Sequence, residues 1–351
     1  MASPRPLGRW RSPGDGVLRH CPYADTVQRW NDLSEVPAGF GPSVVTLGNF
    51  DGVHSGHRML LGRVVEVARS AGAQAVAITF YPHPRLVLHP DQAPVQITSL
   101  EQRLALMEST GLDAVLVMPF TRQLALWSPE QFVGRVFVEV LGASTVVVGR
   151  DTRFGHRNSG DLATLTALGN EHGFAVEVVD DLTLHDAPRR SSSSWARELL
   201  TEGDVIGAAG VLGRPHRLTG EVVHGDHRGR ELGYPTANLE PDVEGMVPAD
   251  GVYAGWMLRS SLPDDAPDRM LPAAISIGTN PTFDGTARRV EAYVLDRTDL
   301  DLYGERVSLE LVSRLRATVR YEGREALIEQ MAKDVEQCRQ LLSRAIVPGE
   351  V

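Results

Sequence analysis

The sequence predicts an α/β protein with two domains of different class: a doubly wound parallel sheet, then a small and mostly antiparallel β-barrel or sandwich. Three observations support this prediction. The chain has 351 residues, enough for two independent cores. Up to about residue 204, short apolar runs alternate with helical stretches, which is typical of a parallel sheet. From about residue 218, short β-type segments separated by turns replace that alternation.

The same changes in pattern divide the chain into three segments. Residues 1–26 are rich in Pro, Gly, Arg and Ser and show no sustained period, so we expect a disordered tail. Residues 27–204 form the predicted first domain, and residues 205–351 form the second. Two domains of different class suggest two activities, or one activity with a regulator.

The first domain shows strand-like runs and helix start signals in alternation. Thr98 with Glu101 has the spacing of a capping box, and Ser128 with Gln131 has the same spacing around a first-turn proline. Ligands of doubly wound sheets bind beyond the carboxyl ends of the strands, so the loops at those ends are candidates for a site. The expected strands are residues 44–47, 75–80, 114–118, 145–148 and 175–179.

Two helical pieces within residues 197–214 precede the β-type segments of the second domain. Its expected strands are residues 220–223, 251–257, 273–277, 289–295 and 307–311. A closing helix carries apolar residues at three- and four-residue spacing, which favours core packing over a partner interface. These residues are Leu327, Ile328, Met331, Val335, Cys338, Leu341 and Leu342.

Composition limits the classes of partner. The formal net charge of -10 argues against nucleic acid or an anionic membrane as a default partner. We find neither an apolar stretch long enough to span a bilayer nor a signal-peptide pattern. Cys21 and Cys338 lie in unrelated contexts, so we expect neither a disulfide framework nor a cysteine metal site. We therefore predict a cytoplasmic protein whose partners are small molecules and whose self-association, if it occurs, is weak or transient.

The near absence of lysine limits which side chains could bind phosphate. Of 35 basic residues only Lys333 is a lysine, and it lies in the closing helix. A phosphate-binding loop with Gly-Lys-Ser/Thr is therefore absent. Any phosphate chemistry must rely on histidine, arginine, backbone amides and a divalent metal.

Residues 48–57 (GNFDGVHSGH) form the most informative stretch of the first domain. They follow the first expected strand and precede a helical pattern that begins near Arg58. A glycine-rich turn between a strand and a helix can bind phosphate on its open N–H groups. His54 and His57 are three residues apart and can face the same ligand. The alternatives are a tight turn whose glycines serve only chain reversal, and histidines that are capping or structural groups.

Residues 225–238 (GDHRGRELGYPTAN) form the corresponding stretch of the second domain. They combine glycines, arginines, a hydroxyl and an amide, which suit ATP with Mg²⁺. Thr236 and Asn238 are two apart on an extended segment, so they point the same way and could supply two oxygen ligands. The alternative is a glycine-rich hairpin with a Pro-Thr-Asn turn. Glu291 interrupts an apolar strand-like run and is either a placed carboxylate or a solvated strand-face glutamate.

The first half resembles a known family in several segments. Residues 48–57 contain NFDGVHxGH and resemble the HxGH turn of the nucleotidyltransferase superfamily, in the form found in the FMN adenylyltransferase half of bacterial bifunctional riboflavin kinase/FAD synthetases. Residues 79–84 (TFYPHP), 148–155 (VGRDTRFG) and 192–197 (SSSWAR) are similar to further segments of that family. The resemblance implies a Rossmann-like nucleotidyltransferase fold. It implies catalytic roles for His54, His57 and Arg197, ATP-binding roles for Gly48, Asn49, Phe50, Asp51, Gly56, Ser193 and Ser194, and flavin-binding roles for His83 and Asp151.

The second half resembles the riboflavin kinase part of the same family. The carrying segment is residues 225–238, and residues 251–254, 277–283, 290–293 and 299–304 also match. The resemblance implies a riboflavin kinase-like barrel in which Glu291 is the general base for the 5′-hydroxyl of riboflavin. It implies ATP-binding roles for Gly225, Gly229, Arg230 and Gly233, metal-binding roles for Thr236 and Asn238, and flavin-binding roles for Tyr253 and Asn280.

These resemblances imply a bifunctional enzyme of FAD biosynthesis. It would phosphorylate riboflavin with ATP to FMN, then adenylylate FMN with a second ATP to FAD and pyrophosphate, with Mg²⁺ as cofactor. Tyr81, Arg150 and Thr152 depart from the family pattern around the first site. They motivate an alternative, a riboflavin kinase whose adenylyltransferase-like half is weakened or regulatory. A further alternative is an adenylyl- or cytidylyltransferase for a different phosphate ester.

Overall fold

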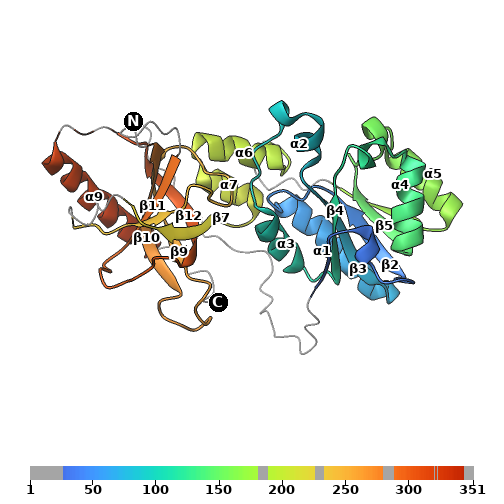
Figure 1. Ribbon diagram of the computed structural model, residues 1–351, viewed down its shortest axis with the longest axis horizontal. Helices are drawn as coiled ribbons and strands as arrows, with labels where there is room; N and C mark the ends of the chain where they lie inside the picture. The colour runs from blue at the N-terminus through green and yellow to red at the C-terminus, as the bar shows by residue number, and fades with distance from the viewer. Residues whose placement is uncertain are drawn as a thin grey trace.

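The computed structural model describes residues 27–180, 189–225, 233–279, 288–319, 321 and 323–343. Figure 1 shows a sheet domain and a barrel domain, with the helices α6 (Ser193–Glu202) and α7 (Val205–Leu212) between them. The predicted tail, residues 1–26, lies outside the described residues, as does Cys21. No described helix combines the length and apolar character needed to cross a membrane.

The first domain contains a parallel sheet, as predicted. Within the described residues its six strands have the order β1-β4-β3-β2-β5-β6. All five predicted strands are present, and the sequence missed only β1, which is three residues long and buries only Trp30. The strands are β1 (Gln28–Trp30), β2 (Ser43–Leu47), β3 (Gln74–Tyr81), β4 (Ala114–Pro119), β5 (Ala143–Gly149) and β6 (Ala175–Val179).

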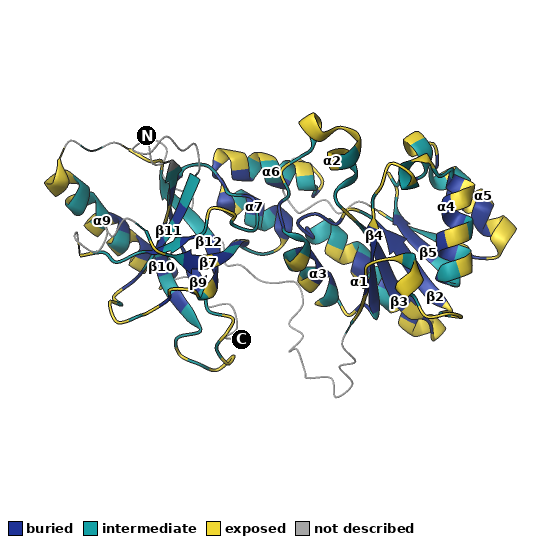
Figure 2. Ribbon diagram, in the orientation of Figure 1, coloured by how far each residue is buried: buried dark blue, intermediate teal, exposed yellow. Residues whose placement is uncertain are grey.

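Helices cover both faces of this sheet. Successive strand residues belong to different core clusters, since Val44 packs with one cluster and Val45 with the other. Figure 2 shows the buried strands between more exposed helices. The predicted cap of Ser128 with Gln131 is confirmed at the start of α4. The flanking elements are η1 (Leu33–Glu35), α1 (Ser55–Ala71), α2 (Pro84–Leu88), η2 (Pro90–Gln92), α3 (Leu100–Glu108), η3 (Leu124–Leu126), α4 (Pro129–Phe132), η4 (Val133–Val140), η5 (His156–Asn158) and α5 (Leu162–His172).

The cap predicted for α3 is wrong by one residue. Ser99 and Gln102 form the capping box, with bonds of 3.1 and 3.2 Å between side chain and backbone, in place of Thr98 and Glu101. The physical reason is tertiary. The hydroxyl of Thr98 lies 3.3 Å from the buried carboxylate of Asp51 and bonds to the turn after β2, so it is not available to the helix.

The second domain is a closed barrel, which settles the choice between barrel and sandwich. In the described part of the chain its strand order is β10-β11-β8-β7-β12-β9, with antiparallel pairs throughout. The five predicted strands are present, and the three-residue strand β8 was missed. The strands are β7 (His216–Val223), β8 (Ala237–Leu239), β9 (Gly251–Leu258), β10 (Met270–Thr279), β11 (Arg288–Val294) and β12 (Arg306–Arg316).

The closing helix α9 (Arg324–Leu342) packs on the barrel as predicted. Cys338 and Leu342 are buried with Trp256 and Leu295 in one cluster, and Val335 packs against it. Burial raises the pKa of the Cys338 thiol to about 12, so the thiol is a core group.

The helices α6 and α7 join the two domains through packing. Leu200 of α6 and Leu212 of α7 belong to the same apolar cluster as Leu218 and Ile275 of the barrel. Ile97 of the first domain belongs to this cluster too. Because α6 and α7 share one core with the barrel, the packing marks no division between residues 204 and 205. The predicted boundary there stays a prediction.

Candidate active sites

The turn after β2 lies at the switch point of the sheet. β2 pairs with β3 on one side and β5 on the other, and the chain order reverses there. Phe50 and Val53 have φ angles of 48° and 38°, in the left-handed region that non-glycine residues seldom adopt. Both side chains are buried, which holds the turn in this conformation. Such local strain is typical of functional sites.

The two histidines of this turn stack on one another. Their ring centroids are 3.6 Å apart at an interplanar angle of 22°. His54 is the N-cap of α1, and its Nδ1 accepts a bond of 3.3 Å from the backbone N–H of His57. A neutral His54 ring therefore carries its proton on Nε2. Gly56 makes room for this ring, because a Cβ there would lie 3.2 Å from it.

Burial keeps both rings neutral at pH 7. It lowers the pKa of His54 to about 4, helped by the positive charges of Arg214 and Arg190. Burial, with smaller effects of His54 and Arg103, lowers the pKa of His57 well below its usual value. Both histidines can therefore donate N–H groups without carrying a charge before a ligand binds.

Unpaired polar atoms gather around this turn. Among the described residues, the Nδ1 atom of His57, the hydroxyl of Ser191 and the Nε atom of Arg103 are buried without a hydrogen-bond partner. The carbonyl oxygen of Ser191 lies 3.9 Å from the position that a Cβ at Gly56 would take, so Ser191 is close to the histidines. Buried polar atoms are normally paired, so a group of unpaired ones indicates a site completed by a ligand or water.

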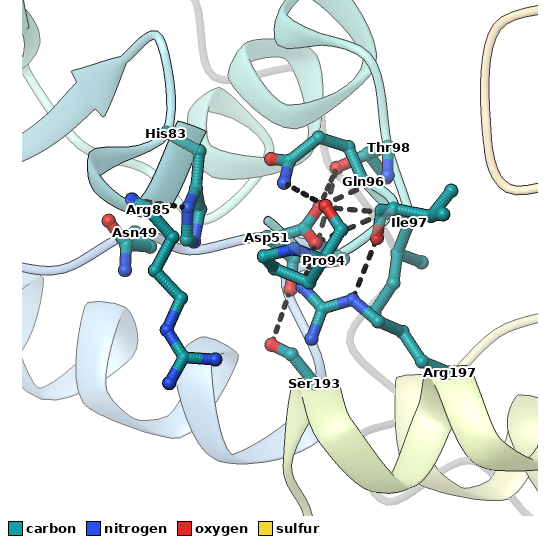
Figure 3. Close-up of polar contacts among 12 residues, drawn as sticks. Asn49, Asp51, His83, Arg85, Pro94, Gln96, Ile97, Thr98, Ser193 and Arg197 are labelled. Carbon is teal, nitrogen blue, oxygen red and sulfur yellow. Dashed lines mark hydrogen bonds and ion pairs between the residues drawn. The ribbon is translucent and has the colours of Figure 1, made fainter. Parts of the chain in front are cut away.

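Asp51 connects the turn to two other segments (Figure 3). Its buried carboxylate accepts bonds of 3.0 and 3.2 Å from the backbone N–H groups of Ile97 and Thr98. Arg197 of α6 forms an ion pair with the same carboxylate at 2.5 Å. Ser193 donates a bond of 2.8 Å to the carbonyl oxygen of Asp51. The carboxylate is thus surrounded by protein donors, and it positions Arg197 beside the turn.

Other predicted residues of the first site lie in the surrounding loops. His83 caps α2 with its Nδ1, which accepts a bond of 3.1 Å from the N–H of Arg85. Burial lowers the pKa of His83, and the negative charge of Asp51 opposes that shift. Asp151 is exposed and forms an ion pair of 2.8 Å with Arg190. Asn49 and Ser194 are exposed, and Gly48 packs against the ring of Phe50.

The three departures from the family pattern are accommodated locally. Arg150 forms an ion pair with Asp180 at the protein surface. The hydroxyl of Thr152 donates a bond of 2.8 Å to the carbonyl oxygen of Gly149. Tyr81 is exposed at the end of β3. None of these contacts involves the stacked histidines.

The barrel brings together the predicted metal and base residues. Asn238 of β8 lies directly opposite Glu291 of β11 in the antiparallel ladder, so their side chains share one face. Gly225 follows β7, and a Cβ there would lie 2.5 Å from the Cγ of Asn238. The amide of Asn238 donates a bond of 3.2 Å to the carbonyl oxygen of Thr236. Four predicted residues from three separate segments therefore meet at one place.

The donor set at this place fits a magnesium ion. Thr236 and Asn238 offer a hydroxyl and an amide oxygen, which are hard ligands, and Mg²⁺ needs few protein groups because it keeps waters and binds phosphates. No group of three or more His, Cys, Asp or Glu side chains suited to a metal occurs among the described residues. A transition-metal site of that kind is thus not seen in the part of the chain that is described.

Five further predicted residues of the second site have other outcomes. Gly229, Arg230 and Asn280 fall outside the described residues. Gly233 is exposed, with a φ of 85°. Tyr253 is fully buried in the barrel core, and its hydroxyl donates a bond of 2.5 Å to the carbonyl oxygen of Ala249. Burial raises the pKa of this phenol. Its position indicates packing and gives no support to the predicted flavin contact.

Two arginines near the first site escaped the sequence interpretation. Arg190 precedes the serine-rich turn and is paired with Asp151. Arg214 lies beside Pro215, at the end of the helical pieces predicted within residues 197–214, and the sequence interpretation gave it no role. In the structure Arg214 contacts the turn after β2. One feature of the sequence could have pointed to them. No lysine lies near the two glycine-rich stretches, so arginine is the side chain left to supply positive charge to a phosphate.

Comparisons with known proteins agree with this division into two sites. The family model described as FAD synthetase matches residues 38–194, and the one described as riboflavin kinase matches residues 212–342. The bifunctional riboflavin kinase/FMN adenylyltransferase of Escherichia coli (strain K12) is 34% identical over 304 residues, covering 87% of this chain and 93% of that protein. The protein of the same name from Listeria monocytogenes is 34% identical over 321 residues, covering 91% and 96%.

A solved structure is similar over nearly the same span. The crystal structure described as a macrolide-efflux protein from Streptococcus pneumoniae matches with a TM-score of 0.78 and 29% identity, covering 89% of this chain and 98% of that chain. Both domains and their arrangement are therefore shared with it. With two family models on successive halves and curated relatives aligned along most of its length, this chain belongs to the bifunctional riboflavin kinase/FMN adenylyltransferase family.

Proposed function

We propose that this protein phosphorylates riboflavin to FMN and then adenylylates FMN to FAD, using one ATP in each reaction. The observation that supports the proposal is that each half brings together residues that we predict to handle phosphate. The first half stacks His54 on His57 at the start of α1, and the barrel sets Asn238 opposite Glu291. Relatives named for both activities align with this chain over more than nine-tenths of their own length.

In the kinase reaction, we assign Glu291 as the general base. Its carboxylate takes the proton of the riboflavin 5′-hydroxyl while that oxygen attacks the γ-phosphorus of ATP, and ADP leaves. Thr236 and Asn238 would hold Mg²⁺, which supplies positive charge to the triphosphate. The ladder pairing supports this assignment, because it sets Asn238 and Glu291 on one face of the barrel.

In the adenylyltransfer reaction, a phosphate oxygen of FMN attacks the α-phosphorus of ATP and pyrophosphate leaves. The start of α1 offers open N–H groups to the phosphates. His54 presents its Nε2–H, and His57 lies beside it with an unpaired Nδ1. Arg197 uses Nε and Nη2 for Val95 and Asp51, so we assign its other terminal nitrogen to the departing pyrophosphate.

Partners and location stay predictions. Flavins and ATP are the small-molecule substrates that the two reactions require. The net charge of -10 supports the expectation of no nucleic-acid partner. A cytoplasmic location and weak or transient self-association follow from the sequence interpretation alone.

Product chromatography tests the proposal directly. The purified protein is incubated with riboflavin, ATP and Mg²⁺, and separately with FMN, ATP and Mg²⁺. We expect FMN and then FAD in the first reaction, and FAD in the second. If the first reaction forms FMN and neither reaction forms FAD, the result favours the alternative motivated by Tyr81, Arg150 and Thr152, a kinase with a weakened or regulatory first half. Absence of FMN from the first reaction contradicts the kinase assignment.

A further inference from the structure

Arg214 joins the end of α7 to the turn after β2. Its Nη2 donates a bond of 2.7 Å to the carbonyl oxygen of Gly52. Its Nη1 donates bonds of 3.3 Å to the carbonyl oxygen of Val53 and 3.2 Å to that of Leu212. Pro215 and the first barrel strand β7 follow at once. One guanidinium group therefore holds the candidate phosphate turn of the first domain from the junction with the second.

The environment of Arg214 is unusual for an arginine. The contacts that the structure gives to its guanidinium are carbonyl oxygens, and none of the ion pairs among the described residues includes it. Burial lowers the pKa of Arg214 to about 10, with smaller effects of Arg58 and Arg217, and the negative charge of Glu310 opposes this shift. Arg214 is half-buried and has no carboxylate in contact among the described residues, which makes its charge costly, so a positive charge kept here indicates a use for it.

The turn also packs against the segments that lead into the barrel. A Cβ at Gly52 would lie 3.0 Å from Ile97 and 3.2 Å from Leu212, two residues of the cluster that contains the barrel core. A Cβ at Gly213 would lie 2.8 Å from the hydroxyl of Ser55, the first residue of α1. These close approaches fix the turn against the junction on the side where Arg214 binds.

Bonds to two successive carbonyl groups set the direction of the peptide groups that contain them. In a planar trans peptide the N–H points opposite to the C=O. The carbonyl of Val53 shares its peptide with the N–H of His54. The carbonyl of Gly52 shares its peptide with the N–H of Val53, which bonds to the carbonyl oxygen of Phe50 at 3.0 Å. By holding both carbonyls, Arg214 directs the N–H of His54 away from the junction.

We propose that Arg214 is a positioning residue for adenylyltransfer, which holds the peptide groups of residues 52–54 so that His54 and the start of α1 face the nucleotide phosphates. The inference rests on the proposed function of the first domain. It means that the adenylyltransferase site depends on the segment that begins the kinase half. The kinase site has no such dependence, since its residues lie on the barrel itself.

The test uses the full-length variants Arg214→Ala and Arg214→Lys. We expect kcat/KM for FAD formation to fall about 10- to 100-fold in Arg214→Ala, because bonds from a charged donor are lost. Most of the loss lies in kcat and in KM for ATP, with KM for FMN little changed. Arg214→Lys should be intermediate, since an ammonium group lacks the fork that spans two carbonyls. Guanidinium at a non-denaturing concentration should restore part of the activity of Arg214→Ala.

Riboflavin kinase activity, measured in the same preparations, reports on folding, because the barrel begins directly after Arg214. The matched control is Arg217→Lys, an exposed arginine on β7 that pairs with Glu310, and both of its activities should be unchanged. The deciding quantity is the ratio of adenylyltransferase to kinase activity. If Arg214→Ala does not fold, the ratio in Arg214→Lys decides.

A lowered ratio in the Arg214 variants supports the proposal. A wild-type ratio, whether both activities are retained or both fall together, overturns it. Failure of the proposed function looks different, because the wild-type protein then forms no FAD from FMN.

Discussion

The two candidate sites are built in different ways. The turn after β2 is held by segments far away in the sequence, through Asp51 to Arg197 and through Gly52 to Arg214. In the barrel, Asn238 and Glu291 face one another because β8 and β11 are neighbours in one ladder. The first site thus depends on tertiary contacts with α6 and with the domain junction, and the second on strand register. Substitutions remote from the reacting atoms should therefore damage the first site and spare the second.

The sharpest way to separate the two sites is to remove the proposed base. We expect Glu291→Gln to abolish FMN formation, a loss of about 100- to 10,000-fold, because the amide cannot accept the hydroxyl proton. Conversion of FMN to FAD should stay at the wild-type rate. Both rates are measured by product chromatography on one preparation. Loss of both activities, or of neither, contradicts the separation of the two sites.

Asp51→Asn tests whether the first site depends on its buried ion pair. Asp51 is 1% exposed and accepts bonds from Ile97 and Thr98 as well as the pair with Arg197. Removing its charge leaves a nearly buried guanidinium without its partner, which costs about 3–5 kcal/mol. We expect the Asp51→Asn variant to unfold at a lower urea concentration than the wild type. We also expect its rate of FAD formation to fall, because the turn after β2 is displaced. The matched control is Asp113→Asn, which breaks a more exposed ion pair with Arg69 and should leave FAD formation unchanged.

Kinase activity is the internal comparison for Asp51→Asn. Because the barrel ladder does not include Asp51, FMN formation should persist at temperatures where the variant remains folded. An Asp51→Asn protein with wild-type FAD formation would show that the ion pair is not needed to position the turn.

Features of the two sites that depend on local sequence patterns could be predicted, and features that depend on tertiary contacts could not. The strands and the turn at His54 were predictable because apolar runs and motif spacing are local. The α3 cap was not, because Thr98 and Ser99 both carry hydroxyls and only the contact of Thr98 with Asp51 decides between them. β8 is too short for an apolar pattern, since it contains three residues.

The limits are clearest for single side chains in matched motifs. A tyrosine in a strand can face a ligand or the core, and only the closed barrel shows that Tyr253 is buried. The sequence interpretation gave Arg214 no role, because its partners are the carbonyls of residues that lie 162 and 161 positions earlier. Backbone carbonyls carry no side-chain signature, so no motif could reveal this contact.

The pH dependence of stability compares one buried histidine from each region. Burial lowers the pKa of His54 and of His216 to about 4 each. Both take up protons more readily when unfolded, so they stabilise the protein above the unfolded value near 6.5, and this contribution is lost as pH falls toward 4. Between pH 7 and pH 5 each should lower the free energy of unfolding by about 2 kcal/mol.

Urea denaturation of His54→Gln and His216→Asn at the two pH values measures these contributions. Each variant should lose less stability than the wild type on acidification, and only in the transition of its own domain where two transitions are resolved. Equal losses in all three proteins would show that neither histidine is held neutral by burial.

The smallest expected effect tests the barrel site by steric means. A Cβ at Gly225 would lie 2.5 Å from the Cγ and Nδ2 of Asn238, so Gly225→Ala must push the proposed metal ligand aside. We expect KM for ATP in the kinase reaction to rise about 10-fold, or about 1.4 kcal/mol, with FAD formation from FMN unchanged. The control is Gly210→Ala in α7, where a Cβ would meet nothing within 4 Å and alanine suits the helix. If KM for ATP in the kinase reaction of Gly225→Ala equals the wild-type value, the position of Asn238 does not matter for ATP binding, and its proposed role as a metal ligand is contradicted. If FAD formation falls as well, the barrel site is coupled to the first site, and the contrast between local register and junction contacts is wrong.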